Sequence, residues 1–182
     1  MRIKDIVKDD MNPEQRRIYD EIASGPRGKV QGPLKVWLHS ASLADKAQKL
    51  GQFCRYESSL PTHLSELAIL VTGRFWGAEF EWYAHKKIGF ETGLDPVLVE
   101  AIRTRQVPNF TTDAERIVYE FATQLHRDHR VGDATYTAAI AEFGETGVVD
   151  LVGVLGYYTL ISFTLNVFEV PVPDGEKTPF GR

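Results

Sequence analysis

The stretch "SELAILVTGRFWGAEFEWYAH", residues 65–85, joins an apolar run to a dense polar motif. The apolar positions of residues 64–75 cover more than half the circumference of a helix, which is typical of a helix in the middle of a bundle. Gly77 then offers a break, and a second helix from about residue 78 carries the polar motif as far as Gly93. Two such helices in succession favour an all-α fold.

Helix signals recur on both sides of this stretch. Asn12, followed by a proline and a capping-box glutamine, predicts a helix over residues 12–24. In the next helix, residues 43–56, one face at helical spacing is expected to be buried: Leu43, Ala47, Leu50, Phe53 and Cys54. Caps and periodicity predict further helices over residues 95–103, 112–129 and 133–143, the last capped by Asp133.

The last long element, residues 147–168, is apolar and long enough to span a bilayer. Asp150 and Asn166 lie inside it, and Gly153 and Gly156 permit close helix contact. These polar residues favour a buried core helix over a membrane span. The sequence therefore predicts an all-α helical bundle with no membrane partner.

Composition points to one soluble domain. The chain has 182 residues, 43% hydrophobic and 25% charged, and is interpreted as a single domain over residues 1–182. Its core is expected over about 30–168, with the helix at 12–24 and a Pro-rich tail at 169–182 as extensions.

Charge and cysteine content exclude several classes. The net charge is −4 and no Lys/Arg cluster exceeds two residues, which argues against nucleic acid as a partner. The single cysteine, Cys54, allows neither an intramolecular disulfide nor a thiolate metal cluster. No secretory signal is recognised at the N-terminus, and a cytoplasmic location is expected.

Glu81 and His85 are the first candidates for chemistry. They are four residues apart, so they share one helix face, where a carboxylate can orient the imidazole as a general base or acid. An ordinary solvated pair has the same spacing. Glu66 adds a second carboxylate on a helix that reads as buried, although an acid near a helix N-terminus also serves the helix dipole.

Two basic side chains are candidates for substrate binding. Arg74 can hold a carboxylate with its planar fork, or neutralise a nearby acid. His39 is either a second proton donor or a core ring with its polar atoms satisfied.

The sequence offers little for a metal or cofactor. His126 and His129 have a spacing that can bind zinc, but the charged residues around them and the lack of a third ligand favour a solvated face. Gly-rich phosphate loops, nucleophile elbows and zincin motifs are missing from the sequence. We expect no metal and no cofactor.

Residues 60–93 resemble the carboxymuconolactone decarboxylase and alkylhydroperoxidase D (AhpD) family, and the likeness extends over roughly 30–125. The peroxidase branch carries a glutamate, eleven residues, a cysteine, two residues, a cysteine, three residues and a histidine. Glu66 and His85 occupy the glutamate and histidine places, whereas Ala78 and Glu81 stand where the two cysteines would be. Two-cysteine peroxide reduction is not expected, because neither replacement supplies a thiolate.

The decarboxylase branch keeps a glutamate and a histidine at the places of Glu81 and His85. The resemblance therefore implies a cofactor-independent decarboxylase, or a related proton-transfer enzyme, acting on a small carboxylated unsaturated lactone in aromatic catabolism. His85, Glu81 and Glu66 would move the proton, and Arg74 or His39 would hold an oxygen. The cavity walls would be the nearby aromatic residues, although such rings are often plain core: Trp76, Phe80, Trp82 and Tyr83.

The resemblance also implies a homo-oligomer, either a trimer or a hexamer. Two other functions stay open: an AhpD-like antioxidant protein, and a non-catalytic binder of small ligands that has lost the chemistry.

Overall fold

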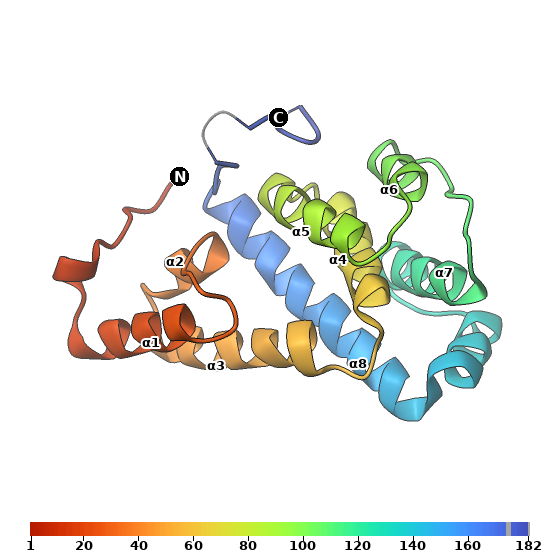
Figure 1. Cartoon of the computed structure of the whole chain (residues 1–182), viewed down its shortest axis with the longest axis horizontal. Helices are drawn as coiled ribbons and strands as arrows, with labels where there is room; N and C mark the ends of the chain where they lie inside the picture. The colour runs from red at the N-terminus through yellow and green to blue at the C-terminus, as the bar shows by residue number, and fades with distance from the viewer. Residues whose placement is uncertain (174–175, 182) are drawn as a thin grey trace.

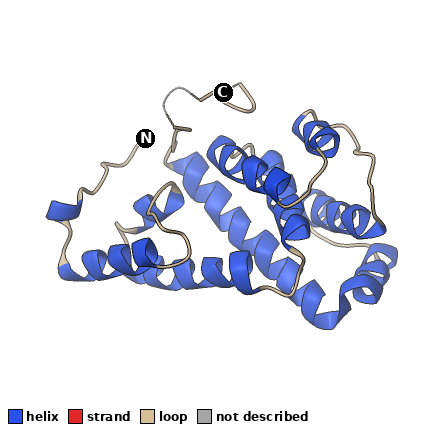
Figure 2. Cartoon of the chain, viewed as in Figure 1, coloured by secondary structure: helices blue, strands red, loops and turns tan. Residues whose placement is uncertain are grey.

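The computed structural model describes residues 1–173 and 176–181. Within these residues all regular elements are helices joined by loops, so the all-α prediction is confirmed (Figure 2). The predicted tail, 169–182, includes residues 174, 175 and 182, which lie outside the described residues. The elements are η1 (Lys8–Asp10), α1 (Pro13–Ser24), α2 (Pro33–Trp37), α3 (Ala41–Gln52), η2 (Phe53–Glu57), α4 (Thr62–Trp76), α5 (Glu79–Glu91), α6 (Pro96–Arg103), α7 (Asp113–Asp128) and α8 (Asp133–Val167).

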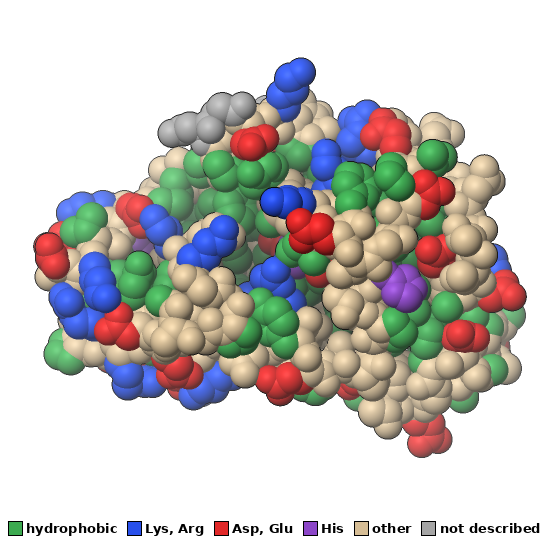
Figure 3. Space-filling view, in the orientation of Figure 1, with side chains coloured by type: hydrophobic (Ala, Val, Ile, Leu, Met, Phe, Trp, Pro, Cys, Tyr) green, Lys and Arg blue, Asp and Glu red, His purple; other side chains and the backbone are tan. Residues whose placement is uncertain are grey.

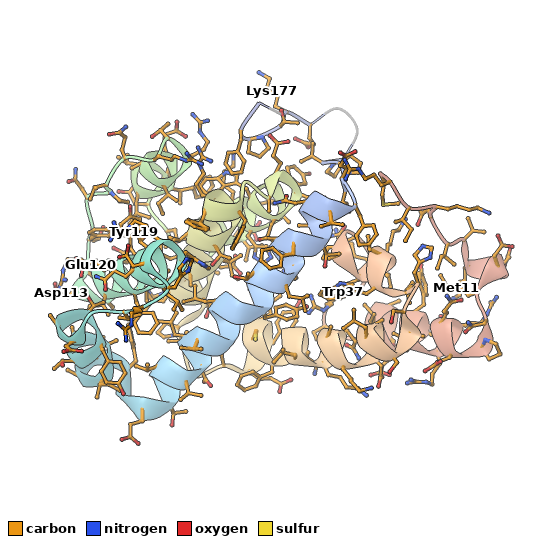
Figure 4. The ribbon with its side chains drawn as sticks, turned by 180° about the vertical axis from the view of Figure 1, so that it is seen from behind. Met11, Trp37, Asp113, Tyr119, Glu120 and Lys177 are labelled. Atoms are coloured by element: carbon orange, nitrogen blue, oxygen red, sulfur yellow. The ribbon has the colours of Figure 1, made fainter. Side chains whose placement is uncertain are left out.

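Helix α8 crosses the whole molecule. Figure 1 shows α1, α2 and α3 on one side of it and α4, α5, α6 and α7 on the other. Helix α4 packs against α5, α7 and α8, and α2 packs against α8 from the opposite side. The view from behind shows Trp37 beside α8, where its Nε1 donates a hydrogen bond to Thr164 Oγ1 at 2.9 Å (Figure 4).

Helix α4 lies at the centre, as its apolar pattern predicts. Every residue from 64 to 73 is buried, because α4 contacts other helices on several sides. Only Phe75, predicted to be part of this core, is 42% exposed. Gly77 ends α4 in the left-handed conformation, with φ of 63°, and α5 begins two residues later.

Helix caps follow the sequence signals with one exception. Asn12 Oδ1 accepts a hydrogen bond from the Gln15 backbone amide at 2.9 Å, and the Asn12 backbone amide donates one to Gln15 Oε1 at 3.0 Å. Asp95 caps α6 with a single bond, because its Oδ1 accepts from the Val97 amide at 2.8 Å. The prediction of an Asp133 cap is wrong, because Gly132 occupies the cap position and α8 has no side-chain cap there.

Helix α8 is a core helix rather than an isolated apolar rod. It is long and apolar enough to cross a membrane, but 61% of its most apolar window is buried inside the protein. Asp150 within it accepts hydrogen bonds from the backbone amide and hydroxyl of Ser59, at 2.8 and 2.7 Å. Gly144, with φ of 68°, interrupts the helical conformation between the two predicted segments.

The predicted buried face of the second helix is right in part. Ala47 and Cys54 are buried as predicted and Phe53 is partly buried, but Leu43 and Leu50 are 42% and 47% exposed. The buried residues of α3 are small or polar: Ala44, Ala47, Gln48 and Gly51. Small residues allow α3 to approach its neighbours closely, and that outweighs the leucine stripe.

Candidate active site

His85 on α5 lies between two carboxyl groups. Its Nδ1 donates a hydrogen bond to Glu66 Oε2 on α4 at 2.7 Å. Its Nε2 forms an ion pair with Glu81 Oε1, one turn earlier on α5, at 2.8 Å. The three side chains are between 3% and 6% exposed. The structure therefore brings together all three residues that the sequence predicts as the catalytic group.

The pKa of His85 reflects a competition. Burial acts to lower the pKa of the imidazole, but the charges of Glu66 and Glu81 and their hydrogen bonds outweigh it and raise the pKa to about 9. At neutral pH the ring is therefore an imidazolium. Its two N–H groups are both engaged by carboxylates, Glu81 from the same helix and Glu66 from α4.

Helix α8 supplies the third side of this site. The Tyr158 ring meets the His85 ring edge-on, with centroids 5.1 Å apart and planes at 83°. Tyr157 packs edge-on against Tyr158 at 5.2 Å. The His85 ring is thus in contact with side chains from α4, α5 and α8.

A cleft of about 1100 Å³ opens beside the cluster. Its walls come from the loop between α1 and α2, from α5, from α8 and from the C-terminal residues 173 and 176–179. Figure 3 shows basic and acidic side chains around a hollow near the middle of this face. The polar lining residues include Arg27, Arg55, Glu81, His85, Tyr157 and Tyr158. The lining includes further charged residues: Lys29, Lys86, Lys87, Glu91, Arg103, Glu176 and Lys177.

A smaller cavity of about 230 Å³ lies beside Glu66. Glu66 and Ser65 line it, and Arg55 lines both spaces. Glu81 therefore belongs to the large cleft and Glu66 to the small cavity. The imidazolium contacts both carboxyl groups and so links the two spaces.

Comparison with known proteins identifies the fold. The amino-acid sequence matches no protein-family model and no curated protein. The structure resembles the AhpD core of an uncharacterized peroxidase-related protein from Ralstonia eutropha JMP134, with a TM-score of 0.78 and 15% identity over 98% of this chain and 94% of that one. This chain has the AhpD-like fold.

Two further structures share the AhpD-like fold. An uncharacterized peroxidase-related protein from Silicibacter sp. TM1040 has a TM-score of 0.72 and 17% identity, over 90% of this chain and 87% of that one. A cysteine-to-alanine variant of the debrominase Bmp8, in complex with 2,3,4-tribromopyrrole, has a TM-score of 0.76 and 14% identity, over 98% and 94%. Identities this low establish the fold and not the activity.

Three of the four predicted wall residues line the cleft of this AhpD-like chain: Phe80, Trp82 and Tyr83. Trp76 does not. Its ring packs edge-on against Phe163 of α8 at 4.6 Å, and its carbonyl accepts a hydrogen bond from Asn166 at 2.7 Å.

Arg74 and His39 lie outside the cleft lining. Arg74 Nε donates a hydrogen bond to the Arg103 carbonyl at 2.6 Å, and its guanidinium lies 4.5 Å from the centroid of the Phe180 ring. His39 is exposed, and its Nε2 lies 2.8 Å from the Lys4 carbonyl oxygen. The structure therefore gives neither residue a place from which to hold a ligand in this cleft.

Sequence reasoning missed the cations that line the cleft, among them Arg27 and Arg55. Arg27 lies in a Gly- and Pro-rich loop, which offers no periodicity to indicate where a side chain points. Tyr157 and Tyr158 were also missed. Two adjacent hydroxyls in an otherwise apolar helix were a usable signal, because a buried tyrosine hydroxyl usually needs a polar partner.

Cys54 is unsuited to redox chemistry. Its side chain is fully buried, and burial, followed by the nearby Asp150 charge, raises the pKa of the thiol to about 11. Ala78, at the place of the first peroxidase cysteine, is also fully buried.

The predicted solvated face at His126 is wrong. His126 is 8% exposed, its Nε2 lies 3.0 Å from Thr72 Oγ1, and its ring stacks on Phe75. Burial lowers the pKa of this imidazole, so it is a neutral core ring. Across residues 1–173 and 176–181, no group of three His, Cys, Asp or Glu side chains is arranged to hold a metal ion.

Proposed function

We propose that this chain is a cofactor-independent enzyme that transfers protons to or from carbon, with Glu66, His85 and Glu81 as the catalytic group. The observation that carries the proposal is the buried imidazolium held between two carboxylates at the wall of a cleft. Buried groups of opposite charge with a shifted pKa, beside a cavity, are typical of sites that move protons. The specific reaction we propose is decarboxylation of a small carboxylated unsaturated lactone in aromatic catabolism.

The reaction needs no electron sink from the protein. When the bond between carbon and the carboxylate breaks, CO₂ leaves, and the electron pair delocalises through the double bond onto the lactone carbonyl oxygen. A proton then adds to carbon and the carbonyl re-forms. The protein supplies that proton, a donor near the developing oxyanion and a site shielded from water.

Glu81 is the group that passes the proton to the substrate. Both His85 nitrogens are engaged, so the Nε2 proton reaches the cleft by transfer to the Glu81 carboxyl group, which lines it. His85 is then neutral. Its lost proton is replaced from the side of Glu66, which faces the smaller cavity.

The lining of the cleft suits a small ring. Phe80, Trp82 and Tyr83 supply aromatic surface next to Glu81. A protein with this fold, the debrominase Bmp8, was solved with the five-membered ring of 2,3,4-tribromopyrrole. A five-membered unsaturated lactone has a similar size and flatness, which supports it as the class of ligand for this chain.

Two other functions fit less well. The peroxidase-related neighbours suggest an antioxidant role, but this chain has a buried, weakly acidic Cys54 as its one thiol. A binder that has lost the chemistry does not need a buried imidazolium. Burying two carboxylates costs desolvation free energy, which a binder has no reason to retain. The buried cluster beside a cavity therefore favours the enzyme.

The test is Glu81→Gln, which keeps the shape of the side chain and removes its proton transfer. Purified protein is screened against unsaturated lactone acids with CO₂ release as the readout. Loss of one acid–base group is expected to slow turnover about 10²- to 10⁴-fold. Glu14→Gln, an exposed change on α1, is the matched control and should retain full turnover. Equal turnover in the parent and Glu81→Gln would refute the proposal.

We also propose that the chain forms a homo-oligomer through the outer face of α8. Gly153 and Gly156 contribute to this helix, and a Cβ added at either would touch nothing within the chain, so a neighbouring helix has room to approach. Large apolar side chains elsewhere on α8 are between 36% and 69% exposed: Val149, Val152, Leu160, Phe163 and Val167. Such a patch is typical of a protein interface. We further propose a cytoplasmic location, because a lone thiol stays reduced there.

A further inference from the structure

Several polar groups in the cleft have hydrogen-bonding capacity left over. The Nε and Nη2 atoms of Arg27 are buried and meet no full hydrogen-bond geometry with the described residues. The Tyr157 hydroxyl is buried in the same way, on a residue only 2% exposed, and the Arg27 side chain is the group that acts on it as a hydrogen-bond partner. Buried donors are nearly always satisfied in folded proteins, so donors left over at a cavity are available to a ligand or to water. Both residues line the cleft that holds Glu81 and His85.

Arg27 and Tyr157 come from distant parts of the sequence and converge over Gly51 of α3. A Cβ added at Gly51 would overlap the Tyr157 hydroxyl and lie 2.5 Å from Arg27 Nη2. Glycine at this position leaves the space in which the guanidinium and the hydroxyl meet. The face of α3 that carries the small residue Gly51 is turned toward Arg27 and Tyr157. Leu43 and Leu50 are therefore left on the exposed side of the helix.

Arg27 and Tyr157 differ in charge, but both are hydrogen-bond donors. Burial raises the pKa of the Tyr157 hydroxyl, and the nearby Arg27 charge opposes this without reversing it. Tyr157 is therefore a neutral O–H donor at neutral pH. Arg27 provides a fixed positive charge with a planar set of N–H donors, which matches a carboxylate in shape and charge.

We infer that Arg27 and Tyr157 form a carboxylate-binding subsite in the cleft. This inference rests on the proposed function and adds to it, because it assigns the recognition of the ligand to residues outside the proton-transfer cluster. The ligand is then an organic anion whose carboxylate lies at Arg27 and Tyr157 while its ring extends toward Glu81.

The subsite holds a carboxylate that does not react. Loss of CO₂ removes the negative charge from a carboxylate, so an arginine that binds this group stabilises the starting state more than the transition state. The anchored carboxylate therefore stays on the product. A decarboxylation substrate of this site carries a second carboxylate near Glu81, whereas a substrate for simple proton transfer needs only the anchored one.

The test measures binding directly with 2-furoate, a small planar ring with one carboxylate, by isothermal titration calorimetry. Its amide, 2-furamide, has nearly the same shape and no charge. The parent protein is expected to bind furoate at least tenfold more tightly than furamide. Arg27→Gln should weaken furoate binding about tenfold or more, because a charged bidentate partner is lost, and leave furamide unchanged. Tyr157→Phe should weaken furoate severalfold.

Lys46→Gln provides the matched control, since it removes one positive charge from the exposed surface of α3 and should leave furoate binding unchanged. Circular dichroism and thermal melting check that each variant is folded. Furoate affinity in Arg27→Gln equal to that of the parent, absence of furoate binding by the parent, or equal affinity for furoate and furamide would each overturn the subsite.

Glu81→Gln separates this inference from the proposed function. If Glu81→Gln stops turnover while Arg27→Gln still binds furoate normally, the subsite is wrong and the proton-transfer proposal stands. If Arg27→Gln loses furoate binding while Glu81→Gln turns over like the parent, the subsite stands and the proposed chemistry is wrong.

Discussion

His85 Nδ1 lies 2.7 Å from Glu66 Oε2, although the two residues are 19 positions apart and belong to different helices. This hydrogen bond joins α4 to α5 inside the core. It also gives the imidazole a second carboxylate, in addition to Glu81 on its own helix. The properties expected of the site follow largely from this pairing.

Removing the charge of Glu66 should lower the pKa of His85. In the parent the two carboxylates raise this pKa to about 9 against the opposing effect of burial. In Glu66→Gln one of those charges is gone, so the pKa is expected to fall by about one unit or more. Titration of the His85 ring signals by NMR measures it. An unchanged midpoint would mean that Glu66 does not act on the imidazole.

The same pairing makes stability depend on pH. The folded pKa of His85 is above its ordinary value of 6.5, so its contribution is fully present below about pH 6.5 and is lost as pH rises through about 9. The shift corresponds to about 3 kcal/mol. Urea unfolding of the parent and of a Glu66→Gln, Glu81→Gln double variant should show this difference in pH dependence. Parallel profiles between pH 6 and 10 would contradict it.

His85→Ala should destabilise the protein at neutral pH. Without the imidazolium, two carboxylates are left close together in the core with no compensating charge, which is expected to cost about 3 kcal/mol or more in the free energy of unfolding. Chemical denaturation measures the loss. Acidic conditions, which protonate the carboxylates, should recover part of it, and stability equal to the parent at pH 7 would be inconsistent with the buried cluster.

Cys54 should be unreactive in the folded protein. Its raised pKa and complete burial predict that a thiol reagent labels it only when the protein unfolds. Cys54→Ser should leave lactone turnover unchanged. The parent should show no catalytic peroxide consumption, and consumption that disappears in Cys54→Ser would instead favour the antioxidant function.

Self-association should depend on the outer face of α8. A Val152→Glu change introduces a charge at a position that is 48% exposed in the single chain, so it should leave folding intact. Light scattering should give the parent a mass that is a multiple of 20.5 kDa, and the variant the mass of one chain. A monomeric parent, or a variant of unchanged mass, would rule out this interface.

Local signals in the sequence are sufficient for most helix boundaries. The capping box at Asn12, the cap at Asp95 and the break at Gly77 all lie where predicted, because capping depends on residues within one turn of each other. The Glu81–His85 contact is equally local, since a spacing of four residues sets it.

Which face of a helix is buried is less local. The leucine stripe of α3 points outward and the small residues point inward, because the space over Gly51 is filled by Arg27 and Tyr157 from elsewhere in the chain. His126 was expected to be solvated among charged neighbours, yet it is buried against Thr72 and Phe75 of α4. Both outcomes depend on packing between helices, which periodicity within one helix does not encode.

By itself, the sequence determined the all-α fold, the order of the helices and the pairing of Glu81 with His85, because short-range spacing and backbone capping control these features. Only the tertiary structure decided which His85 nitrogen contacts Glu66, that Arg74 and His39 lie outside the cleft, and that Arg27 and Tyr157 lie within it. Those relationships join residues far apart in the chain. Their geometry is fixed by how α3, α4, α5 and α8 pack, and that packing is a property of the whole core.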